Sequence, residues 1–137
     1  MKKAPSKSVH VSGKRKKAIA RATLSEGKGV IRINHHLLEH YQPEMCRMKI
    51  QEPLILAGDV ANHINIDVHE QGGGFSSQTE AARLAIARAI VQFSKDKQLR
   101  QKFLDYDRHL LVADTRFNEP HKPNDSKPRA ARQKSYR

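Results

Sequence analysis

The sequence is poor in the residues that build disulfides, zinc clusters and aromatic cores. Its 137 residues include a single cysteine, Cys46, no tryptophan and only 5% aromatic residues. One cysteine excludes an internal disulfide and a cysteine zinc cluster, and it is typical of a reducing compartment. The core must therefore rest on Ile, Leu, Val and Ala, and the length suits one domain with a tail.

Long apolar runs are missing as well. No stretch approaches the roughly 20 apolar residues that a membrane-spanning helix needs, and nothing resembles a signal peptide. We therefore expect a cytoplasmic protein with no membrane partner.

Carboxylates are scarce at the two ends of the chain. Residues 1–21 contain eight cations and no carboxylate, residues 22–114 contain eleven cations and twelve carboxylates, and residues 115–137 contain seven cations and two carboxylates. The whole net charge of +12 thus lies at the ends of a nearly neutral body, which predicts a polyanionic partner. The candidate RNA-binding cations are Lys14, Arg15, Lys16, Lys17 and Arg21 near the N-terminus and Arg116, Lys122, Lys127, Arg129, Arg132 and Lys134 near the C-terminus.

These shifts in composition predict three regions: a flexible basic arm over residues 1–8, a globular α/β body over 9–113, and an extended basic tail over 114–137. The tail contains three prolines and no core-forming pattern, so we expect it to be ordered only on a partner.

The body alternates between strand and helix patterns. Strict alternation predicts strands at 18–24 and 63–69, and residues 9–11 suit a short strand. Turn residues at 25–29 predict that 30–34 returns as the antiparallel hairpin partner of 18–24. Helices are expected at 44–50, at 54–57 after Pro53 and around Leu99 and Phe103. The longest helical pattern follows residues 72–74 and ends near Ser94, and it should be packed on two sides, with Arg83 and Arg88 on the flanks between its apolar stripes. One stripe contains Ala82, Ala85, Ile86, Ala89, Ile90 and Phe93, and the weaker stripe opposite contains Leu84, Ala87 and Val91.

A glycine triplet, Gly72-Gly73-Gly74, precedes the long helix. Three glycines allow a sharp turn or a close approach to a flat partner such as an RNA backbone. Ser77 and Glu80 match a capping box at the helix start. A nucleotide site is the alternative reading, but no G-x-x-x-x-G-K-[ST] element is present.

The sequence patterns that could indicate catalysis or metal binding are incomplete. The histidine pairs His36 with His40 and His63 with His69 lack a carboxylate partner or an H-E-x-x-H pattern. Cys46 has no base near it in the sequence. We expect no enzymatic activity, no metal and no cofactor.

Four blocks resemble a known family: GKRKKAIARATL at 13–24, EPLILAG at 52–58, GGGFSSQTEAARLAIARAIV at 72–91 and DTRFNEPHKPNDSKPRAARQKSYR at 114–137. The chain resembles the universal small-subunit ribosomal protein family number nine in its archaeal and eukaryotic-like form. It departs from many members at His35-His36 in the strand turn and at Lys127-Pro128-Arg129 in the tail.

The resemblance implies a fold and a role. The fold is a ribosomal protein S5 domain 2-like single α/β domain, in which a small mixed sheet packs with helices, plus an extended basic C-terminal tail. The role is that of a structural constituent of the small ribosomal subunit, bound to ribosomal RNA and neighbouring ribosomal proteins in the subunit head. The tail would reach the peptidyl-site transfer RNA, and the residues nearest to it would be Ser135, Tyr136 and Arg137.

Two other functions remain open on sequence grounds. One is a nucleotide-binding enzyme that uses the Gly72–Gly74 loop, and the other is a general nucleic-acid condensing protein. Stoichiometric ATP or GTP binding would favour the first, and equal affinity for duplex DNA and folded ribosomal RNA would favour the second.

Overall fold

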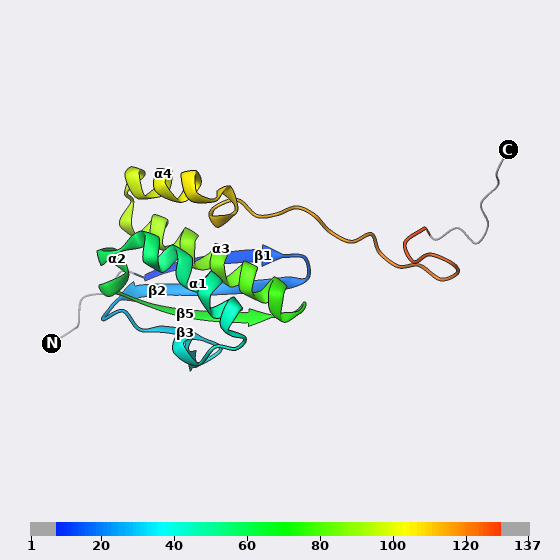
Figure 1. The fold of residues 1–137 in the computed structure, drawn as a ribbon, viewed down its shortest axis with the longest axis horizontal. Coiled ribbons are helices and arrows are strands. Elements are labelled where there is room, and N and C mark those ends of the chain that lie inside the picture. Colours follow the sequence, from blue (N-terminus) through cyan, green and yellow to red (C-terminus); the bar gives the residue numbers. More distant parts are fainter. Residues whose placement is uncertain (1–7, 130–137) are drawn as a thin grey trace.

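The computed structural model describes residues 8–129, and residues 1–7 and 130–137 lie outside this part. A five-stranded mixed sheet carries helices on one face (Figure 1). The strands are β1 Ser8–Arg15, β2 Ala18–Glu26, β3 Ile31–Ile33, β4 His36–Leu37 and β5 Ile64–Gln71. The helices are α1 Glu44–Ala57, α2 Asp59–Asn62, α3 Phe75–Ser94 and α4 Lys97–Tyr106, with 3-10 turns η1 Leu38–His40 and η2 Arg108–Leu110.

The sheet has the strand order β1-β2-β5-β3-β4. All neighbouring strands are antiparallel except β3 and β5, which run parallel. The predicted α/β class with a small mixed sheet and packed helices is therefore confirmed.

The hairpin predicted between 18–24 and 30–34 is wrong. β2 pairs with β1 on one side and with β5 on the other, so both of its edges are occupied. β3 instead lies on the far side of β5, where Ile31 and Ile33 are opposite Ile66 and Val68. Turn residues between two strand patterns thus marked a change of direction correctly, but not the pairing partner.

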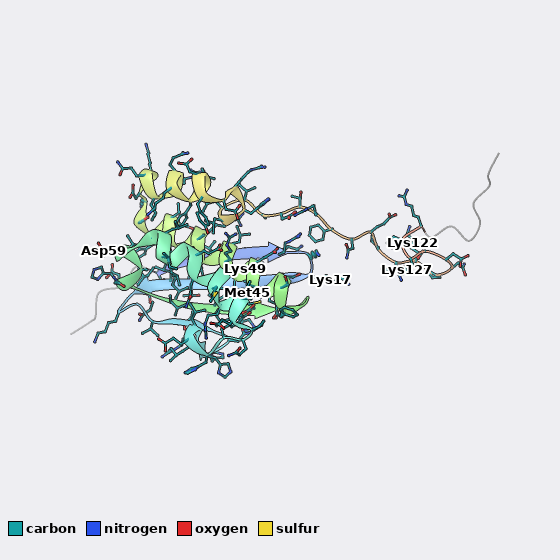
Figure 2. The ribbon with its side chains drawn as sticks, viewed as in Figure 1. Lys17, Met45, Lys49, Asp59, Lys122 and Lys127 are labelled. Carbon is teal, nitrogen blue, oxygen red and sulfur yellow. The ribbon has the colours of Figure 1, made fainter. Side chains whose placement is uncertain are left out.

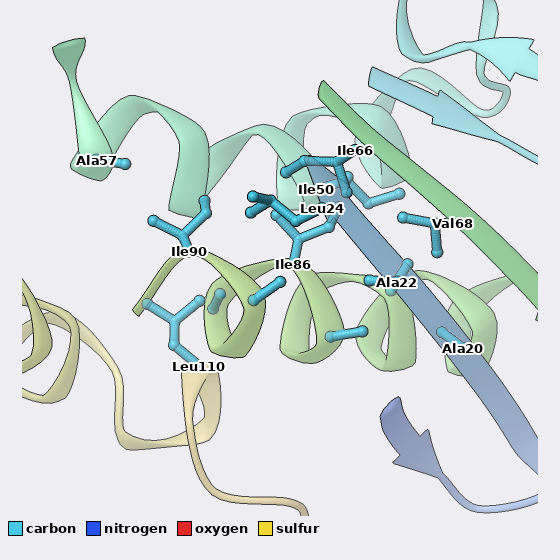
Figure 3. Packing of buried hydrophobic residues seen from close by; sticks show 14 of the residues in the cluster. Ala20, Ala22, Leu24, Ile50, Ala57, Ile66, Val68, Ile86, Ile90 and Leu110 are labelled. Carbon is cyan, nitrogen blue, oxygen red and sulfur yellow. The ribbon is translucent and has the colours of Figure 1, made fainter. Parts of the chain in front are cut away.

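The core lies between α3, α1 and the covered face of the sheet (Figure 3). Alternate residues of β2 and β5 point into it, including Ala20, Ala22 and Leu24 from β2 and Ile66 from β5. Small side chains on β2 let α3 approach closely, and burial of both stripes of α3 confirms the prediction that it packs on two sides.

Gly13 is a consequence of this close approach. A Cβ at Gly13 would lie 2.2 Å from the carbonyl oxygen of Ala81 and 2.8 Å from the backbone nitrogen of Ala85. The backbones of β1 and α3 can therefore approach this closely only because position 13 carries no side chain.

Two predicted helix boundaries are corrected. α1 continues through Pro53 to Ala57, in place of the two helices that the proline predicted. Pro53 is buried in the core, so packing compensates for the lost backbone hydrogen bond. α3 begins at Phe75 with Gly74 as its N-cap, and no side chain caps it, so Ser77 and Glu80 do not form the predicted capping box.

No helix in the described part of the chain is long and apolar enough to cross a membrane.

Candidate nucleic-acid interface

The cationic hairpin lies at one end of the molecule. Lys16 and Lys17 form the turn between β1 and β2, and their side chains and that of Lys14 are exposed. Figure 2 shows Lys17 at this tip, at the end of the body from which the tail departs. Three lysines are thus presented to solvent within four residues of the chain.

The glycine loop packs against the same hairpin. Gly72 and Gly73 have positive φ values of 76° and 65°. A Cβ at Gly72 would lie 2.6 Å from the carbonyl oxygen of Lys17, and one at Gly73 would lie 3.1 Å from the nitrogen of Ala18. The first two glycines are therefore required by a backbone contact within the protein, whereas Gly74 faces open space.

Arg15 differs from the lysines around it. Its side chain points toward the helices and is only 13% exposed. Its Nε donates a hydrogen bond to Oε2 of Glu80 at 2.6 Å, and its Nη2 lies 3.4 Å from Oδ2 of Asp114. The residue predicted to contact RNA thus joins β1 to α3 and to the start of the tail.

The first residues of the tail are held beside the hairpin. Arg116 makes an ion pair with Asp114 at 2.6 Å, and its carbonyl oxygen accepts a hydrogen bond from Arg15 at 3.3 Å. The hydrogen bonds that Asp114 accepts from the side chain and backbone of Arg116 hold the pKa of this carboxyl far below its usual range. Lys14 Nζ lies 5.2 Å from the ring centroid of Phe117, within cation–π range.

Two further arginines fasten the segment that precedes the tail. Arg83 of α3 pairs with Glu52 of α1 and, at 2.9 Å, with Asp107. Arg88 donates to the carbonyl oxygens of Leu111 at 2.9 Å and of Ser12 at 3.1 Å. The sequence placed both arginines on the flanks of the helix, and no local pattern indicated these partners.

Asp107 is stabilised as a carboxylate. Partial burial opposes ionisation, but hydrogen bonds from the backbone of His109 and from Arg83 outweigh it and lower the pKa of Asp107. This part of the surface has a hollow of about 330 Å³ in which arginines already face carboxylates. The ion pairs in this hollow therefore hold the start of the tail on the body, and the arginines there are not free to bind phosphate.

Arg21 lies on the face of the sheet opposite the helices. It is exposed and lines a hollow of about 340 Å³ together with Arg32, Asp67 and His69. Arg32 was missed by the sequence reading, although its place between two inward-facing isoleucines marks it as an outward-facing cation.

The remaining predicted cations are on the part of the tail that follows residue 117. Lys122, Lys127 and Arg129 are exposed, and Arg129 pairs with Glu119 at 2.8 Å. Figure 2 shows Lys122 and Lys127 well away from the body. The predicted residues Arg132, Lys134, Ser135, Tyr136 and Arg137 lie outside the described residues.

A buried polar pair in the core was also missed. Glu70 is 4% exposed, and the hydroxyl of Tyr41 donates to its Oε2 at 3.4 Å. Burial raises the pKa of Glu70, although the hydrogen bond from Tyr41 opposes the shift. Burial likewise raises the pKa of Tyr41 to about 12. The signal was available, since Glu70 continues the inward-facing series of Ile64, Ile66 and Val68.

The histidines do not assemble into a metal site. Within residues 8–129, no group of three or more His, Cys, Asp or Glu side chains could hold a metal ion. His10 makes a hydrogen bond of 3.1 Å with Thr23 on the open face of the sheet.

Known proteins resemble this chain over nearly its full length. The profile of the Ribosomal protein S9/S16 family matches residues 13–137. The chain belongs to this family. "Small ribosomal subunit protein uS9" of Methanococcus maripaludis strain C7 and that of Methanococcus vannielii are each 53% identical to it over 133 residues, which cover 96% of this chain and 99% of each relative.

Membership of the S9/S16 family settles the class of function. The chain is a ribosomal protein with a structural role in translation, and it is not an enzyme. Binding to ribosomal RNA and a location on cytoplasmic ribosomes follow from the family. Family membership therefore rules out the alternative of a nucleotide-binding enzyme that uses the Gly72–Gly74 loop.

Proposed function

We propose that this protein is a structural constituent of the small ribosomal subunit that binds ribosomal RNA in the subunit head through one end of its body. That end combines the tip of the β1–β2 hairpin at residues 14–17, the Gly72–Gly74 loop and the start of the tail. The exposed lysines there neutralise phosphates, and the Gly72–Gly74 loop lies close to the RNA backbone.

The observation that carries the proposal is the convergence of the two cationic segments. Residues 14–17 and 114–117 come from opposite ends of the described chain, and Arg15 joins them through Asp114 and through the carbonyl oxygen of Arg116. Beyond this contact the tail extends outward on the hairpin side of the body (Figure 1). A polyphosphate that approaches this end meets both segments at once.

The tail carries the second half of the proposal. Its exposed cations continue from Arg116 through Lys122 and Lys127 toward the C-terminus, and we propose that residues 135–137 reach the transfer RNA in the peptidyl site. Arginine can fork onto phosphates and Tyr136 can stack on a base or sugar.

Deletion of residues 134–137 tests the tail. We expect subunits with the shortened chain to assemble at normal yield and to bind transfer RNA in the peptidyl site more weakly, because the body docks independently of the last residues. The measurement is filter binding of transfer RNA to purified, programmed subunits. Normal transfer RNA binding combined with failed assembly would show that the roles are assigned wrongly.

A general nucleic-acid condensing protein is the alternative that family membership sets aside, and salt dependence gives a direct check of it. It would bind duplex DNA as tightly as folded ribosomal RNA, and it would leave the subunit when salt is raised. Cosedimentation of the protein with small subunits at moderately high salt favours the ribosomal role, and its complete release favours condensation.

A further inference from the structure

One face of α1 exposes large apolar side chains. Met48 is 51% exposed and Ile55 is 74% exposed, although the rest of the helix buries Cys46, Ile50 and Ala57. An α-helix turns about 100° per residue, so Met48 and Ile55 both lie within about 60° of Gln51. They form one outward-facing strip beside that residue.

The strip borders an apolar groove between α1 and the edge of the sheet. Leu37 of β4 is 41% exposed at this groove, and its volume is about 430 Å³. We call it the α1 groove, and it is lined by Gly29, Val30, Ile31, Leu37, Leu38, Glu39, Gln51 and Leu54. Gln51 lines the α1 groove and also neighbours Met48 and Ile55, so the groove and the strip form one continuous surface.

The charge of this surface differs from that of the hairpin end. Among the described residues, Glu39 is the only charged one that lines the α1 groove, and no lysine or arginine lines it. Arg47 donates to the backbone oxygen of Glu39 at 2.8 Å and pairs with the carboxylate of Glu44, so it does not neutralise the carboxylate of Glu39. The lining therefore offers no cation to neutralise the phosphates of a nucleic acid.

Contiguous exposed apolar patches mark protein-binding sites when they are rimmed by polar residues. Within a ribosomal subunit the available partners are RNA and protein, and an apolar lining without a lysine or arginine favours protein. We propose that the α1 groove, with Met48 and Ile55 at its rim, binds an apolar segment of a neighbouring protein of the small subunit. A basic residue of that segment would pair with Glu39. This inference rests on the proposed function, because it takes the small subunit as the setting.

Site-specific photocrosslinking tests the proposal in assembled subunits. Benzoylphenylalanine is placed at position 48 in one preparation and at position 17 in another, and each full-length chain is incorporated into small subunits. We expect position 48 to crosslink to another protein, in a product that resists ribonuclease, and position 17 to crosslink to ribosomal RNA. Peptide mapping of the product from position 48 should identify an apolar segment with a lysine or arginine.

The outcomes separate the two proposals. Crosslinks from position 48 to RNA, to a second copy of this chain or to nothing would overturn the docking surface, provided that position 17 reaches RNA. A protein crosslink from position 48 without an RNA crosslink from position 17 would leave the docking surface standing and remove the assignment of the hairpin.

Substitution of the strip gives an independent readout. Met48→Gln combined with Ile55→Gln should keep the thermal midpoint and the affinity for ribosomal RNA, because both side chains are exposed. The occupancy of the crosslinked neighbour in salt-washed subunits should fall about fivefold or more, by quantitative mass spectrometry. Tyr106→Gln is the matched control, since Tyr106 is exposed on α4 and does not line the α1 groove. Equal occupancy in the double variant and the control would overturn the proposal.

Discussion

Arg15 and Asp114 lie with Nη2 and Oδ2 3.4 Å apart, and each side chain is only 13% exposed. Through this contact the first hairpin of the body holds the first residues of the tail. A sequence region that looked like a uniform run of RNA-binding cations thus contains one arginine that serves the fold. Its neighbours Lys14, Lys16 and Lys17 remain exposed for a partner.

Loss of the Arg15 side chain should weaken the fold. We expect Arg15→Met to lower the free energy of unfolding by about 1 to 2 kcal/mol, between the values typical of exposed and buried ion pairs. Because Arg15 pairs with Glu80, the loss should be non-additive with Glu80→Gln in a double-mutant cycle measured by urea unfolding. Lys17→Met is the control, with a change within about 0.5 kcal/mol. Strict additivity of the two substitutions would contradict the pairing.

Any side chain at position 13 should disturb the contact between β1 and α3. Gly13→Ala places a methyl group against backbone atoms of Ala81 and Ala85 that cannot move without shifting the helix. We expect a loss of about 3 kcal/mol, at the upper end of overpacking costs, by urea denaturation. Ser12→Ala, at the adjacent exposed position of β1, should change stability by less than about 0.5 kcal/mol. A neutral Gly13→Ala variant would mean that β1 and α3 are further apart.

Glu70 should make stability depend on pH. Burial raises its pKa in the folded state, so the folded protein holds the proton more tightly than the unfolded chain does. Stability therefore falls as pH rises from the unfolded pKa through the folded one, and no penalty exists below both. Glu70→Gln should have a higher thermal midpoint than the parent at pH 7 and a similar one at pH 4.

The exposed Glu26→Gln serves as the control for Glu70, with a change within about 0.5 kcal/mol at either pH. A Glu70→Gln variant that is less stable than the parent at pH 7 would show that the carboxylate is stabilised where it lies.

The hairpin lysines should determine the salt dependence of RNA binding. Single replacement of Lys14, Lys16 or Lys17 by Gln should reduce the slope of log K against log salt by about 0.7 to 0.9 for each phosphate that the variant no longer neutralises. The measurement is fluorescence anisotropy with a ribosomal RNA fragment across a salt series. Lys97→Gln is the matched control, because Lys97 is exposed at the start of α4, away from the hairpin (Figure 1). An equal effect at Lys97 would indicate general charge attraction instead of a defined interface.

Local periodicity and composition by themselves determined much of this protein. The alternation of Ile64, Ile66 and Val68 specified β5 and its buried face, and the alanine-rich stripes specified α3 with two packed sides. The charge distribution indicated a polyanionic partner, because the number of charges in each part of the chain depends on the sequence alone.

Only the tertiary structure decided which strands pair and which charges meet. The turn after β2 was readable, but β5 takes the edge that β3 was expected to occupy, and Pro53 stays inside α1 because the core packs around it. Glu80 matched a local capping motif and instead pairs with Arg15, which lies far away along the chain. Patterns within a few residues reflect backbone preference and burial. Pairing between distant residues depends on how the whole chain packs, and it leaves no periodic pattern in the local sequence.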